Sequence, residues 1–354
     1  MITLAQIARQ YGNALCDRKN SVMSSRHRFA LRCISECRTP SLGQMQYACS
    51  PCEEEHLFFH SCGHRSCPQC QQRCHSLWLE RQLRKLLPVS YYMVTFTVPF
   101  EWRSFIFQHQ KTAFDALFTA AKQTLNTFAK NDRHLGGCLG MTAVLHTHSR
   151  QLAFHPHIHV VVPAGVFNTK RTLWYTKSNN YLFNGKALAK VFRAKFTALM
   201  HHKYSSLPND KGKNWVVQCK SVGRGAAALK YLSRYLYRGV ISNRQIIKLE
   251  NNQVTFSYTD SQSKTTKYRT LPAVEFLWLV LQHVLPKGFR RTRDYGFLHG
   301  NAAKTLKRLQ LILKVILPPA IKQQPTKHLC PHCGELMKLT YLYSKNRRNK
   351  LRPA

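Results

Sequence analysis

Acidic residues are scarce in this chain of 354 residues. Asp and Glu total 15, against 54 Lys and Arg, which gives a formal net charge of +39 at pH 7. So large an excess of positive charge repels itself unless it meets a polyanion, and nucleic acids are the abundant polyanions of a cell. The composition therefore predicts a nucleic-acid-binding protein, with no small molecule as its substrate.

Long apolar runs are also missing. No stretch approaches the roughly 18–20 apolar residues of a transmembrane helix. The first residues, MITLAQIARQYGNALCDRK, contain no secretory apolar segment. Membrane attachment is therefore not the expected reason for the charge, and we expect a cytoplasmic protein.

Cysteine, by contrast, is abundant and clustered. Nine of the 13 cysteines fall between Cys16 and Cys74. The odd number and the missing secretory segment favour metal ligation in a reducing cytosol over a disulfide scaffold. The pairs Cys49–Cys52 and Cys67–Cys70 are C-x2-C knuckles, and two knuckles complete a tetrahedral zinc site. We therefore predict that these four cysteines bind one zinc ion.

A second zinc ion would find ligands close by. Cys37 and Cys62 are the leading candidates, and the others are Cys33, His60, His64 and Cys74. One further knuckle, Cys330-Pro-His-Cys333, stands alone near the C-terminus. It is half a zinc site, to which His328 or His332 could add a ligand.

From about residue 76 onward, helix-like and strand-like stretches alternate. Runs rich in β-branched and aromatic residues predict strands, and apolar residues at helical spacing predict helices. The short link at residues 147–151 predicts an antiparallel hairpin of the two strands that flank it. The predicted strands are 92–98, 141–146, 152–162, 215–219, 254–258 and 265–271, and the predicted helices are 76–87, 105–129, 188–200, 226–237 and 273–284.

Three histidines alternate with other residues along the strand predicted at 152–162. In an extended strand, side chains two residues apart project from one face. His155, His157 and His159 would therefore share a face, while Ile158 and Val160 pack a core on the other. Imidazole is a good ligand for divalent metals. The pattern predicts a metal site on this strand.

The helix predicted at 226–237 adds two tyrosines. Tyr231 and Tyr235 are four residues apart and so share one helical face. A tyrosine hydroxyl can attack a phosphodiester and form a covalent phosphotyrosine bond. Lys230, Arg234 and Arg238 flank the pair and would contact phosphate oxygens as charge-assisted donors.

Together, these motifs resemble the two-tyrosine rolling-circle transposases of the HUH nuclease superfamily, of the insertion-sequence 91 type. Cys49-x2-Cys52, Ser61-Cys62 and Cys67-Pro-Gln-Cys70 resemble the zinc-binding domain of that family. His155-Pro-His-Ile-His159 and Tyr231-Leu-Ser-Arg-Tyr235 resemble its catalytic domain. The resemblance extends over residues 37–298.

The resemblance implies an α+β fold: an HUH endonuclease core, with a central antiparallel sheet flanked by helices, preceded by a small cysteine-rich zinc-binding domain. Residues 1–88 would form the zinc-binding DNA-recognition domain and residues 89–300 the catalytic domain. Residues 301–354 would form a basic C-terminal tail with the single knuckle.

The resemblance also implies the reaction. Transposases of this type cut single-stranded DNA at the element's ends, join it to target DNA and pass through 5′-phosphotyrosine intermediates. The two helix tyrosines would be the nucleophiles, and His157 and His159 the principal ligands of Mg²⁺ or Mn²⁺. The third ligand is open between His155 on the same strand and His146 on the neighbouring one. Zn²⁺ would be the cofactor of the N-terminal domain, and the protein would be associated with the bacterial nucleoid.

Two other functions share part of this pattern. A plasmid rolling-circle replication initiator or a relaxase would use the same chemistry at a replication origin. A non-catalytic, zinc-dependent regulator would bind DNA without forming a covalent adduct. A conventional tyrosine recombinase fits less well, because its chemistry relies on arginines around a single tyrosine and needs no histidine metal strand.

Overall fold

The structure is a computed structural model. It describes residues 2–70, 72–177, 182–237, 240–260, 263–317 and 328–344, apart from the side chains of residues 72–75, 234, 235 and 237. The chain divides into two compact units. Unit 1 comprises Met1–Arg73, Tyr237–Val284 and Pro318–Ala354, and unit 2 comprises Cys74–Leu236 and Leu285–Leu317. Unit 1 is thus assembled from three separate segments, whereas the sequence predicted three consecutive domains.

Unit 2 is built on a five-stranded antiparallel sheet with the order β12-β4-β5-β3-β8. Strands β4 and β5 form the predicted hairpin, and β3 pairs with β5 on its other side, so β5 is the central strand. The predicted mixed fold with a central antiparallel sheet is confirmed. The strands are β3 (Tyr91–Thr97), β4 (Met141–His148), β5 (Phe154–Pro163), β8 (Val216–Ser221) and β12 (Thr292–Tyr295).

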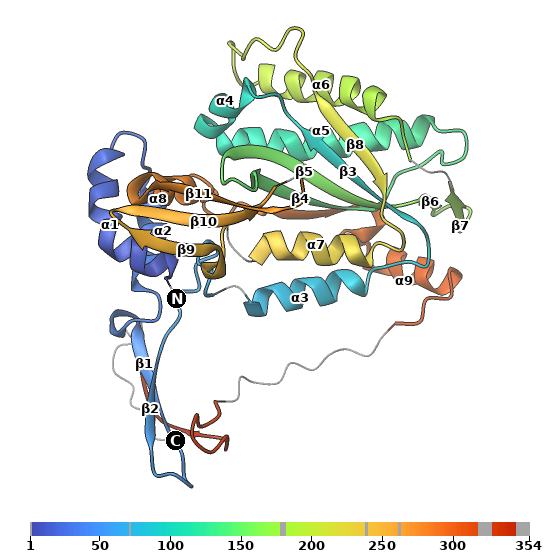
Figure 1. Ribbon diagram of the computed structural model, residues 1–354. Helices are drawn as coiled ribbons and strands as arrows, with labels where there is room; N and C mark the ends of the chain where they lie inside the picture. Colours follow the sequence, from blue (N-terminus) through green and yellow to red (C-terminus); the bar gives the residue numbers. More distant parts are fainter. Residues whose placement is uncertain are drawn as a thin grey trace. The chain divides into compact units, whose positions relative to one another are not determined.

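Alternation along β5 separates an apolar face of the sheet from the face that carries the histidines. The apolar residues of β5 are buried in a core shared with α5 (Gln110–Asn131) and α6 (Gly185–His201), as predicted. These residues are Ile158, Val160 and Val162. Figure 1 shows α5 and α6 on this side of the sheet and α7 (Ala226–Tyr237) on the other.

The remaining helices of unit 2 complete its two layers. Helix α3 lies on the same side of the sheet as α7 in Figure 1. The single helix predicted at 105–129 is instead two helices, α4 and α5, which meet at His109. The other elements are α3 (Gln72–Leu83), α4 (Trp102–Gln108), α9 (Ala303–Ile312), β6 (Gly165–Asn168), β7 (Leu173–Thr176) and the 3-10 turns η3 (Gly296–Leu298) and η4 (Gly300–Ala302).

The described part of unit 1 contains three packed helices and two three-stranded sheets. One sheet, of order β11-β10-β9, includes the hairpin predicted at 254–271. The other, of order β13-β1-β2, joins a C-terminal strand to an N-terminal hairpin. The elements are α1 (Leu4–Arg18), α2 (Ser25–Glu36), η1 (Pro40–Leu42), β1 (Gly43–Ala48), β2 (Glu55–Phe59), η2 (Asn243–Gln245), β9 (Ile246–Glu250), β10 (Gln253–Thr259), β11 (Thr266–Pro272), α8 (Ala273–Leu281) and β13 (Lys338–Ser344).

None of the described helices is long and apolar enough to cross a membrane.

Candidate active site

Three histidines from two neighbouring strands meet on the face of the sheet that α7 covers. One ring nitrogen of His146 on β4 and one each of His157 and His159 on β5 lie within 4.8 Å of one another. The ring centroid of His146 is 4.4 Å from that of His159 and 5.2 Å from that of His157. The centroids of His157 and His159 are 4.9 Å apart. We call these three residues the histidine group.

Of the two candidates for the third ligand that the sequence left open, His146 is the third member of the histidine group, and His155 is not in it. Residues two apart on a strand are separated by about 6.6 Å along it, so His155 and His159 are two such steps apart. Residues opposite each other in an antiparallel pair are closer, at about 4.5–5.5 Å. Because His146 pairs directly with His157 across the strands, it reaches the group that His155 does not.

The structure holds the imidazoles of the histidine group neutral at pH 7. Burial lowers the pKa of His157 to about 4. Burial, with a contribution from His157, lowers the pKa of His159 to about 3. The pKa of His146 is well below its usual value, because that ring is buried and lies beside the other two. A neutral imidazole retains a lone pair for a metal ion.

Hydrogen bonds orient two of these rings. His157 Nδ1 lies 2.7 Å from the carbonyl oxygen of His155. Because a carbonyl only accepts, Nδ1 carries the proton and Nε2 retains the lone pair. The Thr95 hydroxyl lies 2.8 Å from His159 Nδ1. Partners of this kind fix ring orientation in metal sites.

Tyr231 on α7 lies against the histidine group. Its ring centroid is 6.2 Å from that of His159, with the ring planes at 88°. The helix begins directly after Gly225, whose φ is 82° and where a side-chain carbon would lie 2.7 Å from the Tyr91 ring. Only glycine tolerates this conformation and this contact, so the turn determines where α7 starts relative to β3.

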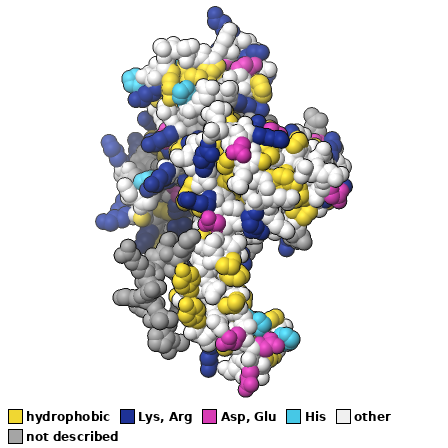
Figure 2. All heavy atoms as spheres, turned by 90° about the vertical axis from the view of Figure 1, so that its left-hand side faces the viewer, with side chains coloured by type: hydrophobic (Ala, Val, Ile, Leu, Met, Phe, Trp, Pro, Cys, Tyr) yellow, Lys and Arg dark blue, Asp and Glu magenta, His cyan; other side chains and the backbone are white. Residues whose placement is uncertain are grey.

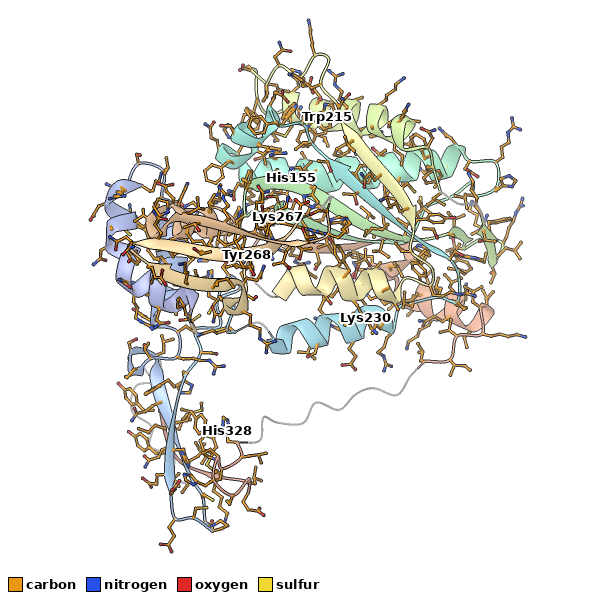
Figure 3. The ribbon with its side chains drawn as sticks, in the orientation of Figure 1. His155, Trp215, Lys230, Lys267, Tyr268 and His328 are labelled. Carbon is orange, nitrogen blue, oxygen red and sulfur yellow. The ribbon has the colours of Figure 1, made fainter. Side chains whose placement is uncertain are left out.

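The structure describes only some of the other residues predicted to act from α7. The side chains of Tyr235 and Arg234, and the whole of Arg238, lie outside the described part of the structure. Lys230 is exposed and, in Figure 3, lies on the side of α7 away from His155. The structure therefore brings one of the two predicted nucleophiles to the histidine group.

Two arginines beside the histidines were not predicted. Burial lowers the pKa values of His155 and His157 on β5, and the nearby charge of Arg103 on α4 lowers both further. Arg291, just before β12, likewise contributes to the low pKa of His146, and its Nη1 donates a hydrogen bond of 3.3 Å to the carbonyl oxygen of Leu236. Both arginines put positive charge where a phosphate group could bind. No spacing marks them in the sequence, because the fold alone brings these segments to the histidines.

A basic groove of unit 2 lies beside the edge strand β12. Its volume is about 1220 Å³, and α3, α5 and residues 287–301 line it. Eight of the lining residues are Lys or Arg and two are Asp. Both carboxylates are paired, Asp115 with Arg293 and Asp294 with Lys85. Five lining cations form no ion pair with any described residue: Arg81, Lys111, Lys122, Lys287 and Arg290.

The cysteines form two clusters, which corrects the predicted grouping of the knuckles. The pair Cys67–Cys70 meets Cys37 and Cys62, with one sulfur from each within 4.8 Å of the others. The pair Cys49–Cys52 meets Cys330–Cys333 instead, within the same limit. Two knuckles that were predicted to share one ion therefore belong to separate clusters.

The hairpin of β1 and β2 explains this separation. Cys49 and Cys52 lie at the turn between the two strands, whereas Cys37 precedes β1 and Cys62 follows β2. The six residues of β1 span about 20 Å, and a zinc ion binds sulfur at about 2.3 Å, so one ion cannot serve both ends. Among the remaining candidates with described side chains, none joins either cluster: Cys33, His60 and His64. The side chain of Cys74 lies outside the description.

Comparisons with known proteins agree with the basic charge of the chain and with its cysteine-rich N-terminal region. Residues 140–305 match a family model described as "Putative transposase", and residues 7–98 match one described as "Transposase zinc-binding domain". The chain is 32% identical to "Putative transposase y4qJ" of Sinorhizobium fredii, over 92% of this chain and 88% of that protein. It is 28% identical to the "Transposase for insertion sequence element IS801" of Pseudomonas savastanoi pv. phaseolicola, over 74% of this chain and 68% of that protein. No solved structure matches the chain.

The chain belongs to the insertion-sequence 91 family of transposases and carries the family's N-terminal zinc-binding domain. The resemblance stated from the sequence is thereby confirmed. As a transposase it acts on DNA, which agrees with its formal charge of +39. Figure 2 shows Lys and Arg side chains outnumbering Asp and Glu on one face. The N-terminal region binds Zn²⁺, and a cysteine cluster lies within it.

Proposed function

We propose that this transposase cuts single-stranded DNA by a metal-dependent HUH-type reaction in which Tyr231 is the nucleophile. The observation that carries the proposal is the contact between Tyr231 and His159, at 6.2 Å between ring centroids, within a group of three buried or half-buried histidines. A tyrosine that served only to pack the helix would not need three neutral imidazoles gathered beside it. Nucleophile and metal ligands on adjoining elements are what such a reaction requires.

The histidine group fits a divalent metal ion. Its three ring nitrogens converge from two strands, and the proton on His157 Nδ1 leaves Nε2 as a donor. Such a donor set suits Mn²⁺ better than Mg²⁺, because Mg²⁺ prefers oxygen ligands. When bound, the ion would polarise a phosphate oxygen and neutralise charge that develops there.

The proposed step exchanges one phosphate ester for another. The Tyr231 hydroxyl loses its proton, its oxygen bonds to the phosphorus, and the bond from phosphorus to the 3′ oxygen breaks. The 5′ phosphate stays on the tyrosine, and the 3′ oxygen takes up a proton and leaves as a hydroxyl. Because the number of ester bonds is unchanged, a later attack by a 3′ hydroxyl can rejoin DNA without a nucleotide cofactor.

Tyr235 would be the second nucleophile. It lies four residues after Tyr231 on α7, and residues at this spacing share one face of a helix. Two tyrosines would hold two DNA ends in turn, one from the element and one from the target. Successive transfers of this kind support rolling-circle-type transposition as the biological process.

Cations around the histidine group would bind the phosphate that reacts. Arg103 and Arg291 lie beside the histidines and are the leading candidates in the structure. The predicted contacts of Arg234 and Arg238 with this phosphate remain part of the proposal, whereas Lys230, on the side of α7 away from His155, would contact other phosphates of the DNA.

The basic groove would hold the DNA backbone outside the reacting segment. Its five cations without an ion pair concentrate positive charge in a concave surface, which attracts phosphates. Two of its aromatic residues, Trp78 and Phe289, are only 4% and 7% exposed, and the ring of the third, Tyr295, lies 5.4 Å from Lys122 Nζ, so the groove offers chiefly cations for phosphate contacts.

The cysteines Cys37, Cys62, Cys67 and Cys70 would bind the zinc ion of the N-terminal domain. Four sulfur ligands leave no open position on zinc, so this site would support the fold and DNA binding rather than the reaction.

The test uses a labelled single-stranded oligonucleotide that carries an end of the element, incubated with the full chain and Mn²⁺. We expect a covalent protein–DNA adduct that mass spectrometry maps to Tyr231, and its loss in the variant Tyr231→Phe. Tyr204→Phe is a matched control in unit 2, because its ring packs against Phe105 and His109, away from the histidine group. Undiminished cleavage by the double variant Tyr231→Phe, Tyr235→Phe would refute the proposal.

A further inference from the structure

The N-terminal knuckle Cys49–Cys52 and the C-terminal knuckle Cys330–Cys333 share two backbone features. In each, the N–H of the first cysteine donates to the carbonyl oxygen five residues later: Cys49 to Glu54 at 2.9 Å, and Cys330 to Glu335 at 2.8 Å. In each, the residue after the second cysteine is left-handed, with φ of 52° at Glu53 and 75° at Gly334. The chain therefore builds one kind of turn twice, at positions far apart in the sequence.

The sulfur atoms of the two turns converge. One sulfur from each of the four cysteines lies within 4.8 Å of the others, and those of Cys49 and Cys333 are 3.5 Å apart. Ligands of a tetrahedral zinc ion at 2.3 Å would be about 3.8 Å apart. The four sulfurs are thus close enough together to bind one zinc ion.

Residues of both the N-terminal and the C-terminal segment surround the four cysteines. Cys49 and Cys330 are buried in a small apolar cluster with Met337, next to Tyr47 and Phe58 of the N-terminal hairpin. The ring of His328 packs on Tyr47 at 4.3 Å and on Phe58 at 4.6 Å. Figure 3 shows His328 beside the β1–β2 hairpin. His328 therefore serves as a packing residue, and His332 Nε2 lies 3.5 Å from the Glu54 carboxylate, so the four cysteines are the ligand set.

Strand β13 also attaches the C-terminal segment to the N-terminal hairpin. It pairs with β1 from Ala48↔Lys338 to Gly43↔Ser344, and His60 Nε2 lies 3.1 Å from the carbonyl oxygen of Tyr343. The matched zinc-binding domain spans residues 7–98 and does not include this segment. The described C-terminal residues are nevertheless a structural part of the N-terminal sheet.

We propose that Cys49, Cys52, Cys330 and Cys333 bind a second, structural zinc ion that fastens the C-terminal segment to the N-terminal zinc-binding domain. The chain then binds two zinc ions, one from N-terminal residues alone and one shared by both ends. The proposal does not depend on the tyrosine chemistry of unit 2.

We call the site of these four cysteines the clasp. The zinc content of the purified full chain tests whether it binds an ion. We expect two zinc ions per chain in the wild type and one in the variant Cys330→Ser, Cys333→Ser. The variant Cys49→Ser, Cys52→Ser should also retain one. The variant with all four substitutions should still retain one, because both knuckles serve the same ion. The matched control Cys138→Ser, Cys219→Ser removes two cysteines outside both clusters and should retain two.

A measurement on the wild-type chain covers the case in which a variant fails to fold. Cys138 and Cys333 are both exposed. A thiol-alkylating reagent should modify Cys138 at once, but should modify Cys333 only after a chelator removes zinc, and Cys49 should become reactive together with it. Two zinc ions retained in Cys330→Ser, Cys333→Ser, or alkylation of Cys333 as fast as Cys138 before chelation, would overturn the proposal.

Discussion

The histidine group of unit 2 and the clasp of unit 1 are assembled in opposite ways. The histidines come from two adjacent strands joined by a short hairpin, so neighbours in sequence become neighbours in the sheet. The cysteines of the clasp come from the two ends of the chain. The first site depends on the local geometry of a hairpin, and the second depends on long-range pairing of β1 with β13.

This difference shows what holds each site in place. The histidine group rests on a sheet whose other face is packed by α5 and α6, so the rings are positioned by an apolar core. The clasp has a much smaller core, of Cys49, Cys330 and Met337, with three flanking residues. A core of that size contributes little, so a metal ion is the expected source of stability.

Zinc removal should produce the largest difference in stability between the two sites. Structural zinc contributes on the order of 10 kcal/mol to the folding of small zinc domains, so amides of β1, β2 and β13 should lose protection from hydrogen exchange after chelation. Amides of β3 and β5 should keep theirs, because an apolar core holds them. Returning Zn²⁺ should restore protection. Equal loss of protection in both sheets would contradict the comparison.

Substitution of single histidines should have the next largest effect. His146→Ala removes a member of the histidine group and should weaken Mn²⁺ binding by more than the roughly 10–100-fold that loss of an outer-shell partner costs. His155→Ala should weaken it by less, since that side chain is outside the group. Calorimetric titration with Mn²⁺ compares the two, and a greater loss in His155→Ala would show that the group is assembled along one strand after all.

Substitution in the basic groove should have the smallest effect, and it should change how DNA affinity depends on salt. In the variant Lys111→Gln, Lys287→Gln, Arg290→Gln, the slope of log affinity against log salt should become less negative by about 2.7, because each phosphate contact contributes about 0.9 to that slope. The control Lys130→Gln, Lys186→Gln, Lys190→Gln removes exposed cations of unit 2 that do not line the groove. Fluorescence anisotropy with a DNA duplex measures both slopes, and equal slopes for the two variants would show that the groove does not bind the backbone.

Much of unit 2 follows from short-range patterns in the sequence. Alternation along β5 predicted which residues enter the core, and Ile158 and Val160 are there. Helical spacing predicted α7, which spans residues 226–237 as expected. In contrast, no local pattern marks the edge strand β12, a four-residue strand that depends on pairing with β4.

The sequence by itself determined the chemistry available to this transposase: a basic chain for DNA, histidines at strand spacing, tyrosines at helix spacing and cysteines in knuckles. These features are set by residues a few positions apart, whose geometry the backbone dictates. Only the tertiary structure decided the partners: His146 for the histidine group, Tyr231 against His159, and Cys330–Cys333 for Cys49–Cys52. Local spacing predicted the hairpin of β4 and β5, but not the register that sets His146 opposite His157. The pairing of β1 with β13 joins segments far apart in the sequence, and spacing along the chain carries no record of it.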